Sequence, residues 1–268
     1  MLRVGIVQMR STDDLAANLA AAEAQVNEAA SAGASWIALP ENFAYLRREG
    51  TPFPCAQGLD GEILGTAASW AKRHHVWLLA GTFPEAASDG RVYNTSVLIS
   101  PEGVQAAVYR KIHLFDVDLR EQGGDPYQES ATIAPGSEPV VADAPFGRIG
   151  LSVCYDLRFP ELYRGYAREG ARFLTVPAAF ARETGKDHWE VLLRARAIEN
   201  QCFVLAPAQW GAHGPDRSSY GRAMIIDPWG LVLAQAADRP CVLVADCDLE
   251  AQDRMRAALP CQSHRRLF

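Results

Sequence analysis

Three chemically reactive side chains stand at the ends of predicted strands in this sequence. Cys154 closes the apolar run GLSV, Glu41 follows the run WIALP, and Lys111 follows an apolar run that ends in YR. Because the ligands of open α/β sheets gather at the carboxyl ends of strands, we expect these side chains to share one site. A cysteine can act as a nucleophile, a carboxylate as a general base and an ammonium group as a stabiliser of negative charge. The three residue types are therefore typical of hydrolysis by a thiol.

Each of these residues also has a structural interpretation. Cysteine often fills buried strands as a small hydrophobic residue, and isolated Glu and Lys side chains are usually solvated. His113 and His188 lie near predicted strand ends as well, so a Cys–His dyad is an alternative to a carboxylate base. The residue pattern predicts a thiol hydrolase and leaves its base open. A helix predicted after Cys154 would stabilise the thiolate through its N-terminus.

Several common sites are missing from the sequence. It contains no GxSxG, HExxH, GxGxxG or GxxxxGK[ST] pattern, which removes the usual serine hydrolase elbow, zinc protease, dinucleotide and P-loop interpretations. The six cysteines form no CxxC pair, and no histidine cluster has metal-ligand spacing. We therefore expect no metal and no organic cofactor.

Composition narrows the class of protein. The chain has 268 residues, of which 49% are hydrophobic and 22% charged, as in an ordinary globular protein with a large core. The net charge of -6 argues against nucleic acid or an anionic membrane as a partner. No apolar stretch approaches the roughly 18 residues of a membrane span, and the N-terminal MLRVGIVQMR does not fit a signal peptide. With unpaired cysteines, these features predict a cytoplasmic protein.

The predicted elements alternate between strands and helices. A strand at 3–9, a helix from about 13 to 32 and a strand at 36–39 form a unit that favours a parallel sheet. The second half repeats this unit, with a strand at 148–153, a helix at 160–169 and a strand at 173–176. Further predicted elements are helices at 66–75 and 190–200 and strands at 76–80, 95–100, 104–109, 203–206 and 223–226.

The two halves also share their turn residues. GASWIALPENFA at 33–44 aligns with GARFLTVPAAFA at 170–181, and ISPEG at 99–103 aligns with IDPWG at 226–230. Strand–helix–strand units are common in α/β proteins, but matched Pro and Gly turns indicate an internal pseudo-two-fold repeat. Two sheets face to face with helices outside predict an α/β fold, a four-layer α-β-β-α sandwich, as a single domain over residues 1–268.

Three blocks of the sequence resemble the signature blocks of the nitrilase superfamily, the carbon–nitrogen hydrolases. They are LPENF at 39–43, YRKIHLFD at 109–116 and GLSVCYDLRFPELYR at 150–164. The resemblance continues through WEVLLRARAIENQ, DPWG and the terminal LPxxxHRRLF, so it covers essentially the whole chain. It implies the same four-layer sandwich and a triad of Glu41, Lys111 and Cys154.

The resemblance also implies a mechanism. Glu41 would take the proton of the Cys154 thiol, provided that burial raises the carboxyl pKa from about 4.3 toward neutrality. Lys111 and the backbone N–H of Tyr155 would hold the oxyanion, and a thioester on the cysteine would then be hydrolysed. Glu129 matches a second glutamate of the family and would orient Lys111 and the substrate. On this interpretation a histidine base is not needed.

The residues after the cysteine indicate a branch of the superfamily. CYDLRFPE lacks the Trp-Glu of nitrile-hydrolysing members and is similar to Nit-type amidases, which act on deaminated glutathione or on 2-oxoglutaramate. VPAAF, HWEVLLRARAIENQ and APAQ favour the first substrate, whose terminal amide would be hydrolysed to a carboxylate and ammonia. Alternatives are an omega-amidase acting on 2-oxoglutaramate, a nitrilase or N-carbamoyl amidohydrolase, and a catalytically silent binding protein with the same fold.

The remaining expectations concern binding. Arg158 would pair with a substrate carboxylate, since arginine binds carboxylates bidentately, although an internal ion pair with Glu161 is an alternative. Phe180, His188 and Tyr45 would line the pocket or serve packing. The expected partners are a small amide substrate that bears a carboxylate and a second copy of the chain in a homodimer, with no nucleic acid and no membrane.

Overall fold

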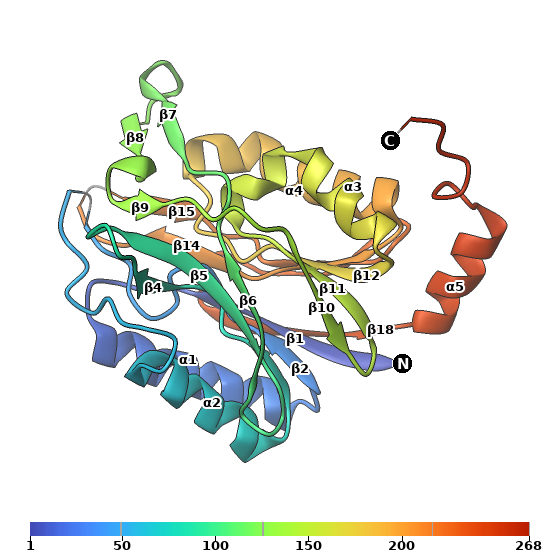
Figure 1. The fold of residues 1–268 in the computed structure, drawn as a ribbon, viewed down its shortest axis with the longest axis horizontal. Helices are drawn as coiled ribbons and strands as arrows, with labels where there is room; N and C mark the ends of the chain where they lie inside the picture. The colour runs from blue at the N-terminus through green and yellow to red at the C-terminus, as the bar shows by residue number, and fades with distance from the viewer. Residues whose placement is uncertain (49, 125, 216, 268) are drawn as a thin grey trace.

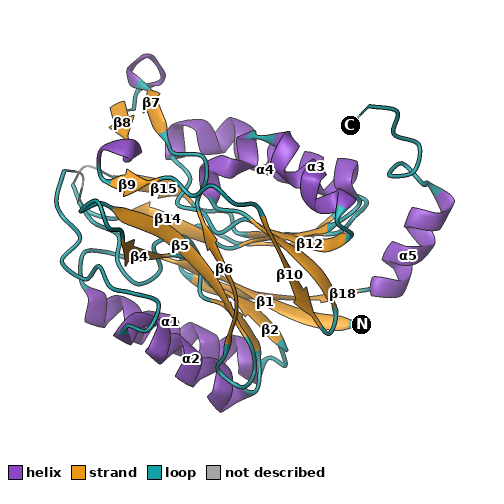
Figure 2. Cartoon of the chain, in the orientation of Figure 1, coloured by secondary structure: helices purple, strands orange, loops and turns teal. Residues whose placement is uncertain are grey.

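The computed structural model describes residues 1–48, 50–124, 126–215 and 217–267. Two sheets stack face to face, and helices cover both outer faces (Figures 1 and 2). Helices α1 (Leu15–Ser31) and α2 (Glu62–His74) cover one sheet, and α3 (Pro160–Arg168) and α4 (Arg182–Asn200) cover the other. The predicted α-β-β-α sandwich is confirmed. No helix in the described ranges is long and apolar enough to cross a membrane.

The first sheet runs in the order β15-β14-β1-β2-β3-β5-β4, with β18 also pairing β1, and β6 and β9 also pairing β5. Its central strands β1, β2 and β3 are parallel, whereas β5 and β6 are antiparallel to their neighbours. The strands of this sheet are β1 (Leu2–Met9), β2 (Trp36–Ala38), β3 (Trp77–Leu79), β4 (Phe83–Ala86), β5 (Val92–Ile99), β6 (Gln105–Arg110), β9 (Ile133–Ala134), β14 (Ala208–Ala212), β15 (Ser218–Tyr220) and β18 (Cys241–Cys247).

The second sheet repeats this arrangement. Its order is β10-β11-β12-β13-β16-β17, with β11, β12 and β13 parallel and β16 and β17 antiparallel to their neighbours. The series β1-β2-β3-β5-β6 therefore matches β11-β12-β13-β16-β17 in order and direction, which confirms the predicted internal repeat. The strands of this sheet are β10 (Val140–Ala144), β11 (Gly147–Leu151), β12 (Ala171–Thr175), β13 (Phe203–Ala206), β16 (Met224–Ile226) and β17 (Val232–Gln235).

One core cluster fills the space between the sheets and continues beneath α3 and α4, and a second cluster lies beneath α1 and α2. Strand β1 serves both clusters, because successive side chains of a strand point to opposite faces. Val4 and Ile6 pack between the sheets, whereas Val7 and Met9 pack with the helices. The ring of Trp36 stacks on Phe146 with centroids 5.0 Å apart and meets the ring of Phe173 edge-on at 5.2 Å.

Several short elements lie outside the two main sheets. They are the hairpin of β7 (Asp116–Asp118) and β8 (Pro126–Gln128), the 3-10 turns η1 (Arg120–Gln122), η2 (Glu129–Ala131) and η3 (Cys154–Arg158), and the C-terminal helix α5 (Leu249–Ala258). In Figure 1, α5 stands at one end of the sandwich, and the chain continues beyond it along the outside.

Two helix starts differ from the prediction. Helix α4 begins at Arg182 rather than at 190, and α2 begins at Glu62 rather than at 66. The first turns of α4 consist of the polar run RETGKDH, whose residues lack the apolar periodicity that predicts a helix. Cys154 also does not enter an α-helix directly, because η3 intervenes before α3 begins at Pro160.

Candidate active site

Glu41 lies just beyond β2 and is buried, with 2% of its surface exposed. Its Oε1 accepts hydrogen bonds from Asn94 Nδ2 at 2.8 Å and from Lys111 Nζ at 3.2 Å. Its Oε2 accepts the backbone N–H of Ala179 at 2.7 Å, and its carbonyl oxygen accepts Gln209 Nε2 at 2.9 Å. Residues from both sheets therefore fix the orientation of this carboxylate.

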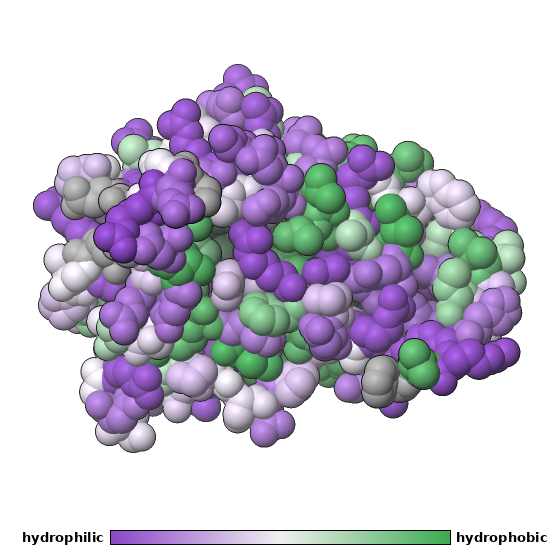
Figure 3. Space-filling model, turned by 90° about the horizontal axis from the view of Figure 1, so that it is seen from above, coloured by the Kyte–Doolittle hydropathy of each residue, from purple (hydrophilic) through white to green (hydrophobic). Residues whose placement is uncertain are grey.

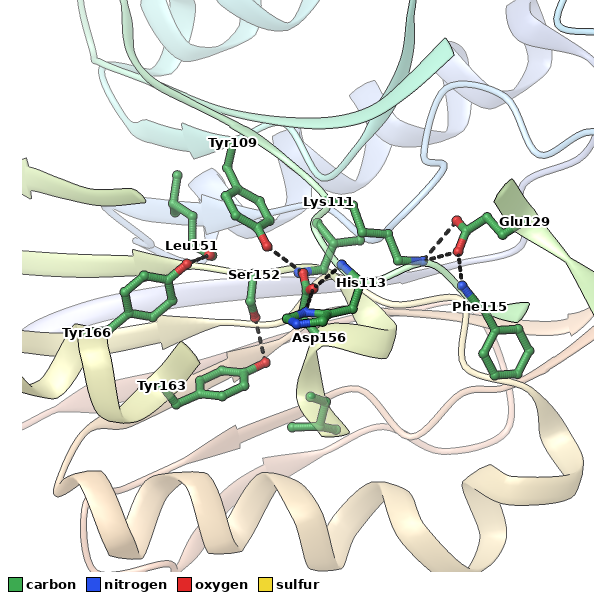
Figure 4. Close-up of polar contacts among 12 residues, drawn as sticks. Tyr109, Lys111, His113, Phe115, Glu129, Leu151, Ser152, Asp156, Tyr163 and Tyr166 are labelled. Carbon is green, nitrogen blue, oxygen red and sulfur yellow. Dashed lines mark hydrogen bonds and ion pairs between the residues drawn. The ribbon is translucent and has the colours of Figure 1, made fainter. Parts of the chain in front are cut away.

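Lys111 follows β6 and is equally buried. Its Nζ donates to both oxygens of Glu129 at 2.9 Å, as Figure 4 shows, in addition to the contact with Glu41. Its backbone is held on both sides, since its N–H donates to Asn94 O at 2.9 Å and its carbonyl accepts Gly136 N–H at 2.8 Å. The ammonium group is thus placed between two carboxylates.

Cys154 begins η3 at the end of β11 and is 8% exposed. Its φ of 49° lies in the left-handed region, which is uncommon for a residue other than glycine and often marks a functional position. The Cys154 N–H donates to Pro177 O at 2.9 Å. The hydrogen bonds within the turn begin with the Asp156 N–H, which donates to Val153 O at 3.0 Å. The turn therefore leaves the N–H of Tyr155 as a candidate donor to a ligand.

The Glu41 pKa differs from the expectation that burial brings it toward neutrality. Burial alone would raise this pKa, but the Lys111 ammonium and hydrogen bonds from the Cys154 thiol and the Ala179 N–H outweigh it. The Glu41 pKa lies below its ordinary value of 4.5. The expectation was wrong because it counted desolvation without the neighbouring cation. Glu41 is consequently ionised, and able to accept a proton, at neutral pH.

The prediction of a stabilised thiolate is also corrected. Burial and the Glu41 charge raise the pKa of the Cys154 thiol well above 9.0, more than the Lys111 charge lowers it. An isolated 3-10 turn supplies less dipole than the predicted α-helix. Burial would lower the pKa of Lys111, but Glu129 and Glu41 raise it. The resting site therefore holds a neutral thiol, an ionised carboxylate and an ammonium ion.

One cavity brings the predicted catalytic side chains together. Its lining includes Glu41, Lys111, Glu129 and Cys154, together with Tyr155 and the predicted pocket residue Phe180. A thiol hydrogen-bonded to a carboxylate base, with an ammonium group beside it, can attack a carbonyl carbon and stabilise the resulting oxyanion. Within the described part of the chain, no group of three His, Cys, Asp or Glu side chains is arranged to hold a metal ion.

The other predicted binding residues lie elsewhere. Arg158 and His188 line a neighbouring cavity, with Arg158 Nη1 3.3 Å from His188 Nδ1 and its guanidinium over the rings of Tyr155 and Phe180. The expected contact of Tyr45 with the pocket is not found, because this buried side chain lies outside the lining of either cavity, near Cys55.

His113 does not contact the cysteine. Its Nδ1 lies 2.7 Å from Asp156 Oδ1, and its ring stacks on Phe159 with centroids 3.6 Å apart. His188 lies in the neighbouring cavity. The geometry therefore favours Glu41 over either histidine as the base.

Sequence reasoning missed the residues that orient Glu41 and two cations of the cavity. Asn94, Ala179 and Gln209 bind Glu41, and Arg47 and Arg217 line the same cavity. Asn94 gave a weak signal as an amide inside the apolar strand β5. A backbone N–H such as that of Ala179 carries no signal in the residue types, and Arg217 lies in a polar turn where arginine is unremarkable.

Comparison with known proteins identifies the family. The sequence model of the carbon-nitrogen hydrolases matches residues 3–257. The chain belongs to this family. This hydrolase is 46% identical over 263 residues to deaminated glutathione amidase of Synechocystis sp., which covers 97% of this chain and 96% of the relative. It is 42% identical over 271 residues to the human protein of the same name, covering 98% and 82%.

Solved structures agree with this assignment. The hydrolase matches the C. elegans NitFhit protein with a TM-score of 0.90 and 38% identity, covering 99% of this chain and 65% of that longer chain. It matches Saccharomyces cerevisiae Nit3, a member of the nitrilase superfamily, with a TM-score of 0.86 and 28% identity, covering 99% and 97%. The fold and the reaction class, hydrolysis of carbon–nitrogen bonds in amides, follow from these relatives.

Proposed function

We propose that this hydrolase cleaves the amide bond of deaminated glutathione, or of a similar 2-oxo acid amide, through a thioester on Cys154. The observation that carries the proposal is the meeting of Glu41, Lys111 and Cys154 in one cavity. The full-length similarity to deaminated glutathione amidases supports the choice of substrate.

The geometry supports a definite sequence of proton transfers. Glu41 takes the thiol proton while the sulfur attacks the amide carbon, and Lys111 with the Tyr155 N–H holds the oxyanion, each donor contributing about 3 kcal/mol. Glu41 then gives its proton to the leaving nitrogen, and a thioester remains. Glu41 next takes a proton from water, which attacks the thioester, and the sulfur leaves with that proton as the acid is released. Glu129 keeps Lys111 in place throughout.

The cations of the cavity favour an anionic substrate. Lys111 is paired with two carboxylates, and Arg47 donates to the Thr51 carbonyl and to Thr132 Oγ1. Arg217 lines the cavity close enough to lower the Glu41 pKa, and its guanidinium has no hydrogen-bond or ion-pair partner in the described ranges. We assign the carboxylate next to the 2-oxo group to Arg217.

Arg158 serves the other end of a longer substrate in this proposal. Its cavity shares Phe115, Tyr155 and Thr184 with the cavity of the triad, so the two adjoin. Deaminated glutathione carries a second carboxylate at its far end, which suits an arginine at this place. No ion pair joins Arg158 to Glu161 in the described ranges, which weakens the structural alternative for this side chain.

The nitrogen product distinguishes the two substrates. The amides of glutathione join amino-acid residues, so the expectation of ammonia was wrong for its deaminated form, which releases an amine. Ammonia is expected only from a primary amide such as 2-oxoglutaramate. A panel of both compounds, a nitrile and an N-carbamoyl amino acid, assayed for acid and for nitrogen product, tests the proposal. We expect the highest kcat/KM with deaminated glutathione. Preference for 2-oxoglutaramate would make the chain an omega-amidase, and turnover of no compound would leave a silent binding protein.

Two arginine variants refine the same panel. Arg217→Gln should raise KM for both 2-oxo acid amides about 10-fold or more, because a hydrogen bond to a charged group contributes about 1.5–3 kcal/mol. Arg158→Gln should raise KM only for deaminated glutathione. An amide without a carboxylate serves as the control and should be unaffected by either change. Equal effects on charged and neutral amides would contradict both assignments.

We also propose a homodimer in the cytoplasm. Figure 3 shows hydrophobic residues, in green, over the middle of the face on which α3 and α4 lie, and Val191 and Ile198 of α4 are 66% and 50% exposed. Six free cysteines agree with a reducing compartment. Sedimentation should give twice the chain mass for the natural protein and a lower mass for a Val191→Glu/Ile198→Glu variant. A monomer of the natural chain at all concentrations would contradict the dimer.

A further inference from the structure

Asp156, two residues after the cysteine, is a fully buried carboxylate that the proposed reaction does not use. Its Oδ2 accepts the Val153 N–H at 2.8 Å and the Tyr109 hydroxyl at 2.7 Å. Its Oδ1 accepts the His113 N–H at 3.0 Å and lies 2.7 Å from His113 Nδ1. Each oxygen therefore has two partners.

Three of these four contacts reach a distant segment of the chain. Capping η3 requires only the Val153 N–H, yet Tyr109 and His113 lie 47 and 43 residues away in sequence. These two residues flank Lys111. Figure 4 shows both of them directed to Asp156, whereas Lys111 between them extends to Glu129.

We infer that Asp156 is a positioning residue, which holds the segment carrying Lys111 in register with the turn carrying Cys154. The inference rests on the proposed roles of those two residues. Burial and the Asp156 charge keep the Tyr109 hydroxyl protonated by raising its pKa, so it remains a donor. The stacking of His113 on Phe159 is a further contact between the segment that carries Lys111 and the turn that carries Cys154.

The expected effect follows from the geometry of an oxyanion donor. A donor must lie about 2.7–3.1 Å from the developing charge, and misplacement by about 1 Å can reduce the rate about 10²-fold. The Val153 contact fixes the turn, and the Tyr109 and His113 contacts fix Lys111 relative to it. Loss of one contact should therefore lower kcat and leave KM, which reflects binding outside the oxyanion, nearly unchanged.

Three buried tyrosines permit a matched comparison. Tyr109 donates to Asp156, whereas the Tyr163 hydroxyl lies 2.7 Å from Ser152 Oγ and the Tyr166 hydroxyl donates to Leu151 O at 2.5 Å. All three are 0% exposed, and Figure 4 shows them in one region. Each Tyr→Phe change removes one buried hydroxyl, but only Tyr109→Phe removes a contact to the Lys111 segment.

The experiment measures kcat, KM and the rate at which iodoacetamide alkylates Cys154. Alkylation requires the thiol but forms no oxyanion, so it does not depend on the position of Lys111 as an oxyanion donor. Tyr109→Phe should lower kcat about 10-fold and Asp156→Asn about 10²-fold at unchanged KM, with alkylation within about twofold of the natural protein. Tyr163→Phe and Tyr166→Phe should keep kcat within about twofold of the natural value, even if their unfolding midpoints fall as far as that of Tyr109→Phe.

Two outcomes would overturn the inference. One is a Tyr109→Phe enzyme with the natural kcat, and the other is an equal loss of kcat in Tyr163→Phe once rates are corrected for the folded fraction. If the natural protein hydrolyses no amide, the proposed function fails and this inference falls with it. An active natural protein that is indifferent to Tyr109→Phe refutes the positioning role alone.

Discussion

Cys154→Ala should lower kcat/KM for amide hydrolysis by at least about 10⁴-fold while the protein remains folded, because removing the nucleophile abolishes the covalent path. The side chain is small, and the alanine retains the Cβ at the same backbone position. Initial rates with the best amide of the panel measure the loss, and an unfolding curve verifies the fold.

Another buried cysteine provides the control. Cys247 lies in β18 with 0% exposure and lines neither of the two cavities. Cys247→Ala should reduce stability slightly, as expected for a small cavity, and leave kcat/KM unchanged. Comparable activity of the two variants would exclude a catalytic thiol at Cys154.

Lys111→Met should destabilise the protein by about 3–5 kcal/mol, because it leaves buried carboxylates without their cation. The Lys111 ammonium lies 3.2 Å from Glu41 and 2.9 Å from Glu129, and the side chain is 2% exposed. The same change removes a proposed oxyanion donor, so kcat of the folded fraction should fall about 10²–10³-fold. Denaturant unfolding and initial rates measure the two effects separately.

The stability effect has two controls. Arg48→Met breaks an exposed ion pair with Asp13 and should cost less than about 1 kcal/mol. Adding Glu129→Gln to Lys111→Met removes one uncompensated charge and should restore part of the lost stability. A Lys111→Met protein as stable as Arg48→Met would show that the buried pair contributes little.

The pH dependence of stability should also have the opposite sign in Lys111→Met and in the natural protein. In the natural protein the Glu41 pKa is lowered, so its ionised form contributes stability above the ordinary carboxyl pKa of 4.5, which is lost as pH falls through the lowered value. Without Lys111, burial governs and the folded carboxyl pKa lies above its unfolded value. The variant should then gain stability as pH falls from 7 toward about 5, where the natural protein should not.

The strand ends of the site could be predicted from the sequence, because short apolar runs followed by Pro or a charge mark them plainly. The carboxyl ends of the parallel strands of both sheets meet at the site, so Glu41 after β2 lies beside Cys154 after β11, although the counterpart of β2 in the repeat is β12. The identity of the base could not be derived from spacing, since His113 and His188 also follow strands. It came from resemblance, and the contacts of Glu41 now support it.

The direction of the pKa shifts could not be predicted from residue types. Burial alone raises a carboxyl pKa, and only the distances to Lys111 and to the Ala179 N–H show that the opposing contributions are larger. The role of Asp156 was likewise hidden, because its partners Tyr109 and His113 lie 47 and 43 residues away in the sequence. Such tertiary contacts leave no local pattern in the sequence.

The most direct test of covalent catalysis by Cys154 is to identify the atom that carries the acyl group. The natural protein is mixed with deaminated glutathione, quenched rapidly with acid during turnover, digested and analysed by mass spectrometry. We expect the mass of a 4-carboxy-4-oxobutanoyl group, which is 2-oxoglutarate joined through its distal carboxyl, on the peptide that contains Cys154, and no increase on any peptide of the Cys154→Ala protein. An acyl group on another residue, or continued turnover by Cys154→Ala, would contradict it.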